Sequence, residues 1–543
     1  MFNGGMAIKH ESEREESLAA DNAKLQAQIE DQRIQIAELK DQNAAFTERV
    51  ATLSKLLFGK SSEKKKPKDS DPVGEKDAGD ANSRSENINV EKRNRGQQRG
   101  STGHGRRDYS NLKTEEVIHD VPEDEQLCPN CSAPYADFGE ETAEQIDWQV
   151  RVSRIVHKRK RYKRTCKCPV RSILVAPIPS KAIPKGMFTT SFLARLLVEK
   201  YVLGRPLERI VAALKNDGFN VAKGTLVGSL KALSILLAPL NEAICAKNRE
   251  AAHLHIDETS WNVFETVENK VNNRWWLWTF VADNTVVFII DQTRSTKVVS
   301  NHLGIDINSN SLEIGSHFLI SSDFYSVYQS LNTLDGVDAL WCWVHIRRYF
   351  IRAGDAHKEL HSWSRTWTKR IGALYVAHRA LSVSTPGSTD YIRAEVEFSE
   401  ALDAIDTARK IEAIDNTLHP GAAKVLATLD NEWEGLSRHK DFLELPLDNN
   451  AAERALRNPV VMRKNCYGSG SVWAAELASR IWTITATAQL IGINPLTYLI
   501  AYLDACATAG GKPPSEMVLE TFLPWLASET DLTIWKNERE QDP

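Results

Sequence analysis

Hydrophobic and polar positions along the chain follow different periods, and each period predicts a different kind of structure. Between residues 18 and 57 apolar side chains recur at heptad spacing, with Asn22 and Asn43 in one of the two seams. A sustained heptad repeat flanked by charged residues is typical of a coiled coil, and polar seam residues fix its register. We therefore predict a coiled coil over residues 9–60 that joins copies into a homodimer or higher oligomer. A single amphipathic helix packed on its own chain is the alternative.

Residues 61–108 contain few large apolar side chains. Such a segment cannot bury enough surface to offset the entropy of ordering it, so we predict a disordered basic linker. Its second half, 92–107, is basic without an acid and ends in Arg106 and Arg107. A basic arm of this kind is a solvated tether, and it also suits a segment that follows nucleic-acid phosphates. Arg106 and Arg107 are therefore predicted to bind DNA.

From residue 181 the pattern is helical, and from residue 253 it changes to a period of two. Helices are predicted over 191–202 and 207–216, with a turn at 217–220 and a further helix from 223. Within a helical domain of 181–250, this arrangement suits a DNA-reading helix-turn-helix and equally a plain helical hairpin. Downstream, strands are predicted over 253–257, 274–282, 285–291, 317–323 and 339–345, with helices from 296 and over 346–350.

Three meandering strands, a helix, a strand, a helix and a strand follow the ribonuclease-H-like order, which we assign to residues 251–500. Residues of about 351–440 interrupt that order with helical patterning, for example over 369–381 and 391–411, and predict a helical insertion. Residues 501–543 form a C-terminal tail region. The fold class expected for the whole chain is multidomain α+β.

The composition adds information mainly through its distribution along the chain. The 543 residues include 68 Lys and Arg against 72 Asp and Glu, a formal net charge of −4. That balance by itself argues against a nucleic-acid-binding protein, but binding needs local rather than overall basicity. Residues 151–167 are strongly basic and alternate with apolar side chains as in a strand. In this ribbon the predicted DNA contacts are Lys158, Arg159, Lys160, Arg161, Lys163 and Arg164.

The chain shows no sign of a membrane segment or a secretory signal. No apolar run approaches the length of a membrane span, and no charged start precedes an apolar stretch. We therefore expect a soluble cytoplasmic protein without a membrane partner.

Four of the eight cysteines form two close pairs, Cys128 with Cys131 and Cys166 with Cys168. Two such pairs have the spacing of a four-thiolate Zn²⁺ site, although the second pair has one intervening residue instead of the usual two. A closed site of this kind stabilises a small fold and leaves no open position for chemistry. We predict structural zinc in a domain over residues 109–180.

Acidic residues on neighbouring predicted strands are the candidates for chemistry. Asp257 lies on the first strand and Asp323 ends the fourth. Two carboxylates side by side stay ionised most readily with a divalent cation between them, and hard oxygen ligands select Mg²⁺ or Mn²⁺. The best third acid is Glu453, in a helix that Asp448 or Asn449 can cap. Taken alone, that segment is better explained as a capped surface helix with a Glu–Arg pair.

Together these motifs resemble those of bacterial DDE transposases of the IS66 insertion-sequence family. The similarity runs from about residue 50 to near the C-terminus, through both cysteine pairs and the motifs at 57–63, 103–107, 255–259, 322–326, 342–348, 449–457, 463–465 and 486–495. The resemblance implies that Asp257, Asp323 and Glu453 are the catalytic residues and hold Mg²⁺ (or Mn²⁺). It further implies a bacterial, nucleoid-associated protein whose partners are element ends, target DNA and small companion proteins of the same element.

One position departs from the family pattern, because Val460 stands where a basic residue is common two helical turns after the catalytic Glu. Arg457, Arg463 and Lys464 are expected to contact DNA instead. Two other functions remain as alternatives. One is a metal-dependent ribonuclease-H-like DNA nuclease without joining activity, and the other is a non-catalytic zinc and coiled-coil DNA-binding regulator, against which the three acids argue.

A cysteine and three histidines near the acids have less specific roles. Cys342 with His345 is interpreted as a packed strand end rather than half of a metal site. His253 and His255 share a strand face with Asp257, and we interpret them as packing or DNA contacts rather than ligands of a hard metal.

Overall fold

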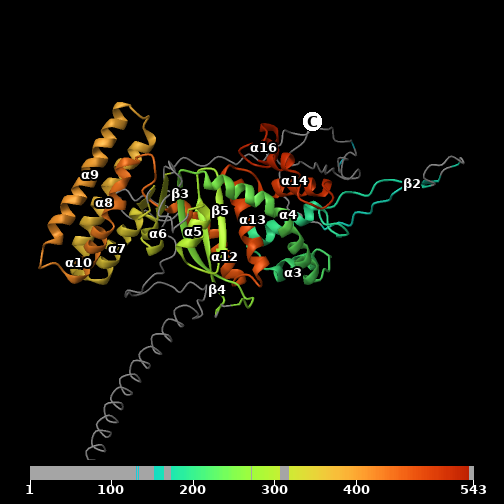
Figure 1. Cartoon of the computed structure of the whole chain (residues 1–543), viewed down its shortest axis with the longest axis horizontal. Helices are drawn as coiled ribbons and strands as arrows, with labels where there is room; N and C mark the ends of the chain where they lie inside the picture. Colours follow the sequence, from blue (N-terminus) through green and yellow to red (C-terminus); the bar gives the residue numbers. More distant parts are fainter. Residues whose placement is uncertain are drawn as a thin grey trace, which may run out of the picture. The chain divides into compact units, whose positions relative to one another are not determined.

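The computed structural model describes residues 130, 133, 152–163, 165, 173–268, 270, 272–305, 317–334 and 336–536 (Figure 1). The chain divides into two units between Asp108 and Tyr109, and every described residue belongs to the second unit. Several sequence predictions therefore lie outside the described residues: the coiled coil, the linker with Arg106 and Arg107, the cysteines Cys128, Cys131, Cys166 and Cys168, and Arg164.

The centre of the described unit is a five-stranded mixed sheet. Its strands are β3 (His253–Asn262), β4 (Arg274–Val281), β5 (Val286–Asp291), β6 (Phe318–Ser322) and β7 (Val337–Trp341). Their order across the sheet is β5-β4-β3-β6-β7, with β3, β4 and β5 antiparallel, β6 parallel to β3, and β7 parallel to β6. Helix α5 (Thr296–Leu303) precedes β6, and helix α6 (Ser326–Leu331) precedes β7. The predicted order of strands and helices is confirmed.

The last predicted strand is wrong beyond Trp341. Cys342 is extended and its N–H still donates to Ser322 O at 3.0 Å, but helix α7 (Trp343–Ala356) begins at the next residue. The N–H of Trp343 donates instead to Leu447 O at 2.9 Å, a contact 104 residues further along the chain that local periodicity does not reveal. His345 consequently lies in the first turn of a helix and not at a strand end.

Helices before the sheet follow the sequence prediction closely. They are α2 (Thr190–Leu197), continued by a π-helical turn over Val198–Val202, then α3 (Leu207–Asn216) and α4 (Lys223–Arg249). Among the described helices, α4 alone is long and apolar enough to cross a membrane by length and composition. Its residues Leu226, Leu233 and Leu237 are fully buried, and α4 packs against α13 (Val472–Leu490), so it is a core helix of this fold.

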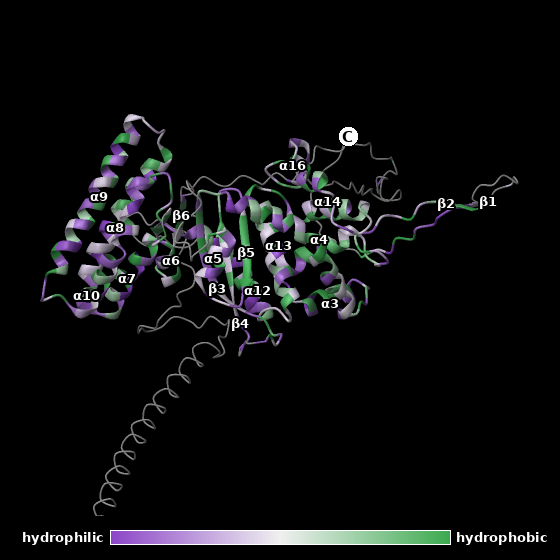
Figure 2. Ribbon diagram, in the orientation of Figure 1, coloured by the Kyte–Doolittle hydropathy of each residue, from purple (hydrophilic) through white to green (hydrophobic). Residues whose placement is uncertain are grey.

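Side chains bind several outward main-chain groups on both outer strands of the sheet. Along β5, Thr487 Oγ1 accepts from Val286 N–H and Thr483 Oγ1 accepts from Phe288 N–H, at 3.0 and 2.9 Å. Figure 2 shows β5 as a strongly hydrophobic strand next to α13, which carries both threonines. Along β7, Arg438 Nη1 donates to Ala339 O at 2.8 Å, and His439 Nε2 lies 3.1 Å from Trp341 O.

Helices fill the predicted insertion. They are α8 (His361–Val383), α9 (Thr389–Ala413), α10 (Pro420–Asn431) and α11 (Trp433–Ser437). The stacked rings of Phe350 and Trp367, with centroids 4.7 Å apart, join α7 to α8. After the insertion come α12 (Asn450–Cys466), α13, α14 (Pro495–Thr508), α15 (Glu516–Glu520) and α16 (Glu529–Trp535). An α+β fold is therefore confirmed for the described residues. A short ribbon of β1 (Arg161–Lys163) and β2 (Ile173–Val175) completes them.

Candidate active site

The strand register places two aspartates side by side. In the parallel pairing of β3 with β6, His253 is opposite Leu319 and His255 is opposite Ser321. Continuing this register by two residues brings Asp257, within β3, level with Asp323, the first residue after β6. The predicted strand order is thus present, and Asp323 lies close enough for its charge to act on Asp257.

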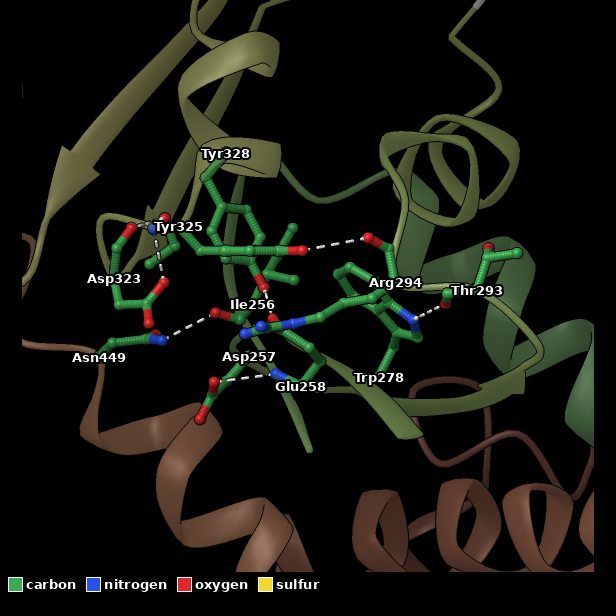
Figure 3. Close-up of polar contacts among 11 residues, drawn as sticks. Ile256, Asp257, Glu258, Trp278, Thr293, Arg294, Asp323, Tyr325, Tyr328 and Asn449 are labelled. Carbon is green, nitrogen blue, oxygen red and sulfur yellow. Dashed lines mark hydrogen bonds and ion pairs between the residues drawn. The ribbon is translucent and has the colours of Figure 1, made fainter. Parts of the chain in front are cut away.

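Main-chain N–H groups orient both carboxylates (Figure 3). The N–H of Glu258 donates to Asp257 Oδ1 at 2.9 Å, and the N–H of Tyr325 donates to Asp323 Oδ1 at 3.0 Å. Each aspartate keeps its second oxygen out of these bonds. Both carboxylates are thereby fixed in direction while retaining an oxygen that can bind a ligand.

Helix α12 is joined to β3 at three levels. At its start, Asn449 donates through Nδ2 to Ile256 O at 2.8 Å. In its last turn, Arg463 Nη1 donates to Thr259 Oγ1 at 2.9 Å. Just beyond its end, Trp261 Nε1 donates to Ser469 Oγ at 3.1 Å. These contacts fix the helix along the strand that carries Asp257.

Asn449 is almost fully buried and occupies the N-cap position of α12, yet its side chain does not cap the helix. Its Oδ1 lies 3.1 Å from His255 Nδ1, and its main-chain N–H points to Cys342 Sγ at 3.3 Å. Asp448 is the residue whose carboxylate accepts the N–H of Asn450, at 3.0 Å. Of the two capping candidates, Asp448 makes the local bond and Asn449 links the helix to the sheet.

Glu453 lies in the first turn of α12, where its N–H donates to Asn449 O at 3.2 Å. Its Oε1 is 3.9 Å from His345 Nε2 on α7. Burial lowers the pKa of His345, so this neighbour is a neutral imidazole near pH 7. The helix therefore brings the third predicted acid to the same site as the two aspartates.

Neighbouring acids change the protonation of Asp257. Burial, followed by the charges of Glu258, Asp323 and Glu453, raises the pKa of Asp257 to about 8. Glu258 has its own cation in Arg294, whereas no Lys or Arg forms an ion pair with Asp257, Asp323 or Glu453 among the described residues. The acids therefore repel one another without a neighbouring cation among the described residues.

The histidines on β3 are engaged in local contacts. His253 Nε2 lies 2.8 Å from Ser321 Oγ, and burial lowers the pKa of His253 to about 3. Burial also lowers the pKa of His255, which contacts Asn449. Both rings are therefore neutral and hydrogen-bonded, in agreement with a packing role.

The predicted DNA contacts differ in their surroundings. Lys158, Arg159, Lys160, Arg161 and Lys163 are exposed on the ribbon, and Arg457 and Lys464 are exposed on α12. Arg463 is part-buried, and its guanidinium binds Thr259 and Ser260. Its visible role is to hold α12 on β3.

Two arginines near the acids were missed from the sequence. Arg348 and Arg352 lie on α7 one turn apart, and their charges act on His345 together with those of Asp323 and Glu453. The signal was present in the spacing of His345, Arg348 and Arg352, which lie on one face of a helix. Because the sequence analysis assigned His345 to a strand, it did not place His345 on the same helix face as Arg348 and Arg352.

Among the described residues, the His, Cys, Asp or Glu side chains that come close enough together to share a metal ion lie in the insertion and not at the three acids. His357, Glu359 and His419 each offer a ligand atom, and these atoms lie within 4.8 Å of one another. His419 Nδ1 already accepts the N–H of Gly421 at 3.0 Å, as the N-cap of α10. A helix-capping role accounts for that ring without a metal.

The sequence around these acids is similar to that of known proteins. Residues 185–477 match the family model described as Transposase IS66 family, a range that contains all three acids. The uncharacterized protein y4qI of Sinorhizobium fredii (strain NBRC 101917 / NGR234) is 24% identical over 372 residues, covering 65% of this chain and 65% of that relative. The uncharacterized protein y4hP of the same strain is 24% identical over 444 residues, covering 76% and 75%. A third, y4jD, is 23% identical over 427 residues, covering 75% and 79%.

Proposed function

The chain belongs to the transposase IS66 family, and we propose that it is a DDE transposase that binds the ends of its insertion sequence, cleaves there, and joins the 3′-OH ends to target DNA. The observation that carries this proposal is that Asp257 on β3 feels the charges of both Asp323, directly after the adjacent parallel strand β6, and Glu453 on α12. The sheet order β5-β4-β3-β6-β7 supports a ribonuclease-H-like catalytic domain.

Asp257, Asp323 and Glu453 suit Mg²⁺ or Mn²⁺ as ligands because all three offer hard oxygens. His345, whose Nε2 lies 3.9 Å from Glu453, and Asn450, three residues before Glu453 on α12, each have a buried side-chain atom without a hydrogen-bond partner among the described residues. When bound, such ions activate the attacking water and stabilise the leaving 3′ oxygen in phosphoryl transfer.

The residues of the chain contribute orientation and charge. Main-chain N–H groups orient the carboxylates of Asp257 and Asp323, and Asn449 fixes the start of the helix that carries Glu453. Exposed Arg457 and the α7 arginines Arg348 and Arg352 supply positive charge for DNA phosphates beside the acids.

The remaining parts of the proposal concern assembly. Structural Zn²⁺ bound by Cys128, Cys131, Cys166 and Cys168 would stabilise the basic ribbon. The coiled coil would bring two copies, and so two element ends, together. The family membership supports a cytoplasmic DNA-binding protein, and small companion proteins of the same element are further proposed partners.

Cleavage and joining of the element's own ends test the proposal. Asp257→Asn, Asp323→Asn and Glu453→Gln should each abolish Mg²⁺-dependent cleavage while end binding, measured by gel shift, survives. Glu395→Gln, an exposed acid on α9, is the matched control and should cleave normally. Normal cleavage by any triad variant would remove that residue from the site.

Pre-cut ends supplied with target DNA separate the alternatives. A transposase yields joined product, whereas a nuclease of the same fold yields none. Binding of the ends without Mg²⁺-dependent cleavage or joining would instead favour the non-catalytic regulator.

A further inference from the structure

Glu258 is a buried acid next to Asp257 that the proposed chemistry does not use. Its side chain is only 1% exposed. Successive residues of a strand point to opposite faces of the sheet, so Glu258 faces away from α12 and toward α6. Burying a carboxylate is costly unless it is paired, so the partners of Glu258 identify its role.

Three contacts satisfy this carboxylate (Figure 3). Arg294 donates to Oε1 through Nε at 2.7 Å and also through Nη2, and the hydroxyl of Tyr328 donates to Oε2. Tyr328 lies on α6, and Arg294 lies in the segment between β5 and α5. Glu258 therefore connects β3 to two segments that flank β6.

Arg294 extends the connection to the residue that orients Asp323. Its guanidinium carbon lies 3.6 Å from the ring centroid of Tyr325, and the Tyr325 hydroxyl donates to Arg294 O at 3.3 Å. The N–H of Tyr325 in turn donates to Asp323 Oδ1. A continuous set of contacts thus leads from the residue after Asp257 to the residue that holds Asp323.

Strand pairing alone does not hold Asp323. The strand β6 ends at Ser322, so Asp323 and the turn that follows it lie beyond the ladder. Tyr325, through its N–H to Asp323, and Tyr328, through its hydroxyl to Glu258, connect this turn to β3. Loss of Glu258, which contacts Tyr328 directly and Tyr325 through Arg294, would leave Asp257 in place on β3 and loosen the turn that carries Asp323, which the packing of Phe324 on Trp341 also holds.

We propose that Glu258 is a positioning residue that, through Tyr328 and Arg294, sets the separation of the Asp257 and Asp323 carboxylates and so the affinity of the site for divalent metal. This inference rests on the proposed function, because it assumes that these two aspartates bind metal.

Mn²⁺ binding to the full-length chain, counted by electron paramagnetic resonance without DNA, tests the proposal. Tyr328→Phe removes only the hydroxyl, and Glu258→Gln keeps the shape but removes the charge. Each should weaken Mn²⁺ binding about tenfold, the usual effect of removing a partner that orients a metal ligand. The Mn²⁺ concentration for half-maximal cleavage should rise by a similar factor, and excess Mn²⁺ should restore the rate.

Tyr502→Phe is the matched control. Tyr502 lies on α14, and its buried hydroxyl donates to a main-chain oxygen, Leu236 O at 2.8 Å, instead of to Glu258. The Tm of Tyr502→Phe should fall as that of Tyr328→Phe does, with Mn²⁺ affinity unchanged.

The outcomes separate the two proposals. If Asp257→Asn abolishes Mn²⁺ binding but Tyr328→Phe and Glu258→Gln, folded by circular dichroism, bind Mn²⁺ as the wild type does, the positioning role is overturned and the proposed function stands. Equal Mn²⁺ binding by wild type and Asp257→Asn would overturn the metal site itself.

Discussion

The side chain of Asn449 donates a hydrogen bond to the main-chain oxygen of Ile256, the residue directly before Asp257, although 193 residues separate them in the sequence. This bond and the contact with His255 set where α12 begins and therefore where Glu453 lies. These contacts fix the position of Glu453 although a long helical insertion precedes α12.

Asn449→Ala should lower both stability and cleavage. It leaves the buried Ile256 oxygen and His255 Nδ1 without partners, at a cost of about 1–3 kcal/mol for such a group. Urea unfolding measures the loss, and cleavage at a temperature where the variant is fully folded measures the displacement of Glu453. Full cleavage by the folded variant would show that other contacts place the helix.

Asp257→Asn should stabilise the metal-free protein while abolishing cleavage. Burial and the charges of Asp323 and Glu453 raise the pKa of Asp257 to about 8, so folding around this carboxyl costs free energy near neutral pH that an uncharged asparagine does not. A ligand that binds only the folded state raises Tm, so Mg²⁺ should stabilise the wild type and leave the variant unchanged. Thermal unfolding with and without Mg²⁺ checks both effects, and an equal Mg²⁺ shift in the two proteins would count against the site.

Stability should fall on acidification partly because of His302. Burial lowers the pKa of His302 from 6.5 to about 3, and its ring nitrogen lies 2.8 Å from Asn248 Oδ1. As the pH falls, His302 therefore takes up a proton in the unfolded chain at a higher pH than in the folded protein. The stabilising effect of the neutral ring is complete above pH 6.5 and is lost as the pH falls toward 3. Between pH 3 and 6.5, His302→Gln should reduce the slope of unfolding free energy against pH, by an amount that corresponds to up to about one bound proton. An unchanged slope would contradict the assignment.

The arginines of α12 should separate into two classes. Arg457→Ala should weaken DNA binding and reduce the slope of log affinity against log salt by about one, with unfolding unaffected. Arg463→Ala should instead lower Tm, since its guanidinium holds Thr259 and Ser260. Filter binding over a salt series and thermal unfolding measure the two effects, and a reversal of the two classes would refute the distinction.

Zinc content should depend on the paired cysteines alone. Wild-type protein is expected to contain one Zn²⁺ per chain by elemental analysis, and Cys128→Ser should lose it. Cys466→Ser is the matched control because Cys466 is a half-buried free thiol on α12. Zinc retained by Cys128→Ser would exclude the four-thiolate site.

Local patterns were sufficient to predict the strands and the position of two acids. Alternation of apolar side chains predicted β3 and β6, and the strand order then placed Asp257 beside Asp323. Glu453 needed the family resemblance, because its contact with the sheet depends on Asn449 and Ile256, which no local period connects. His345 was assigned to a strand because Trp341 and Trp343 continue an apolar pattern, whereas the helix start depends on the distant Leu447. The partners of Glu258 are likewise set by tertiary contacts.

Side chains that bind main-chain groups of the two edge strands affect how copies of the protein can associate. Unpaired edge strands promote aggregation by pairing with strands of other molecules. Here Thr483 and Thr487 occupy the outer side of β5, while Arg438 and His439 occupy that of β7. These side chains oppose the addition of a further strand to either edge of this sheet, so an assembly of several copies on DNA is expected to leave the sheet at five strands.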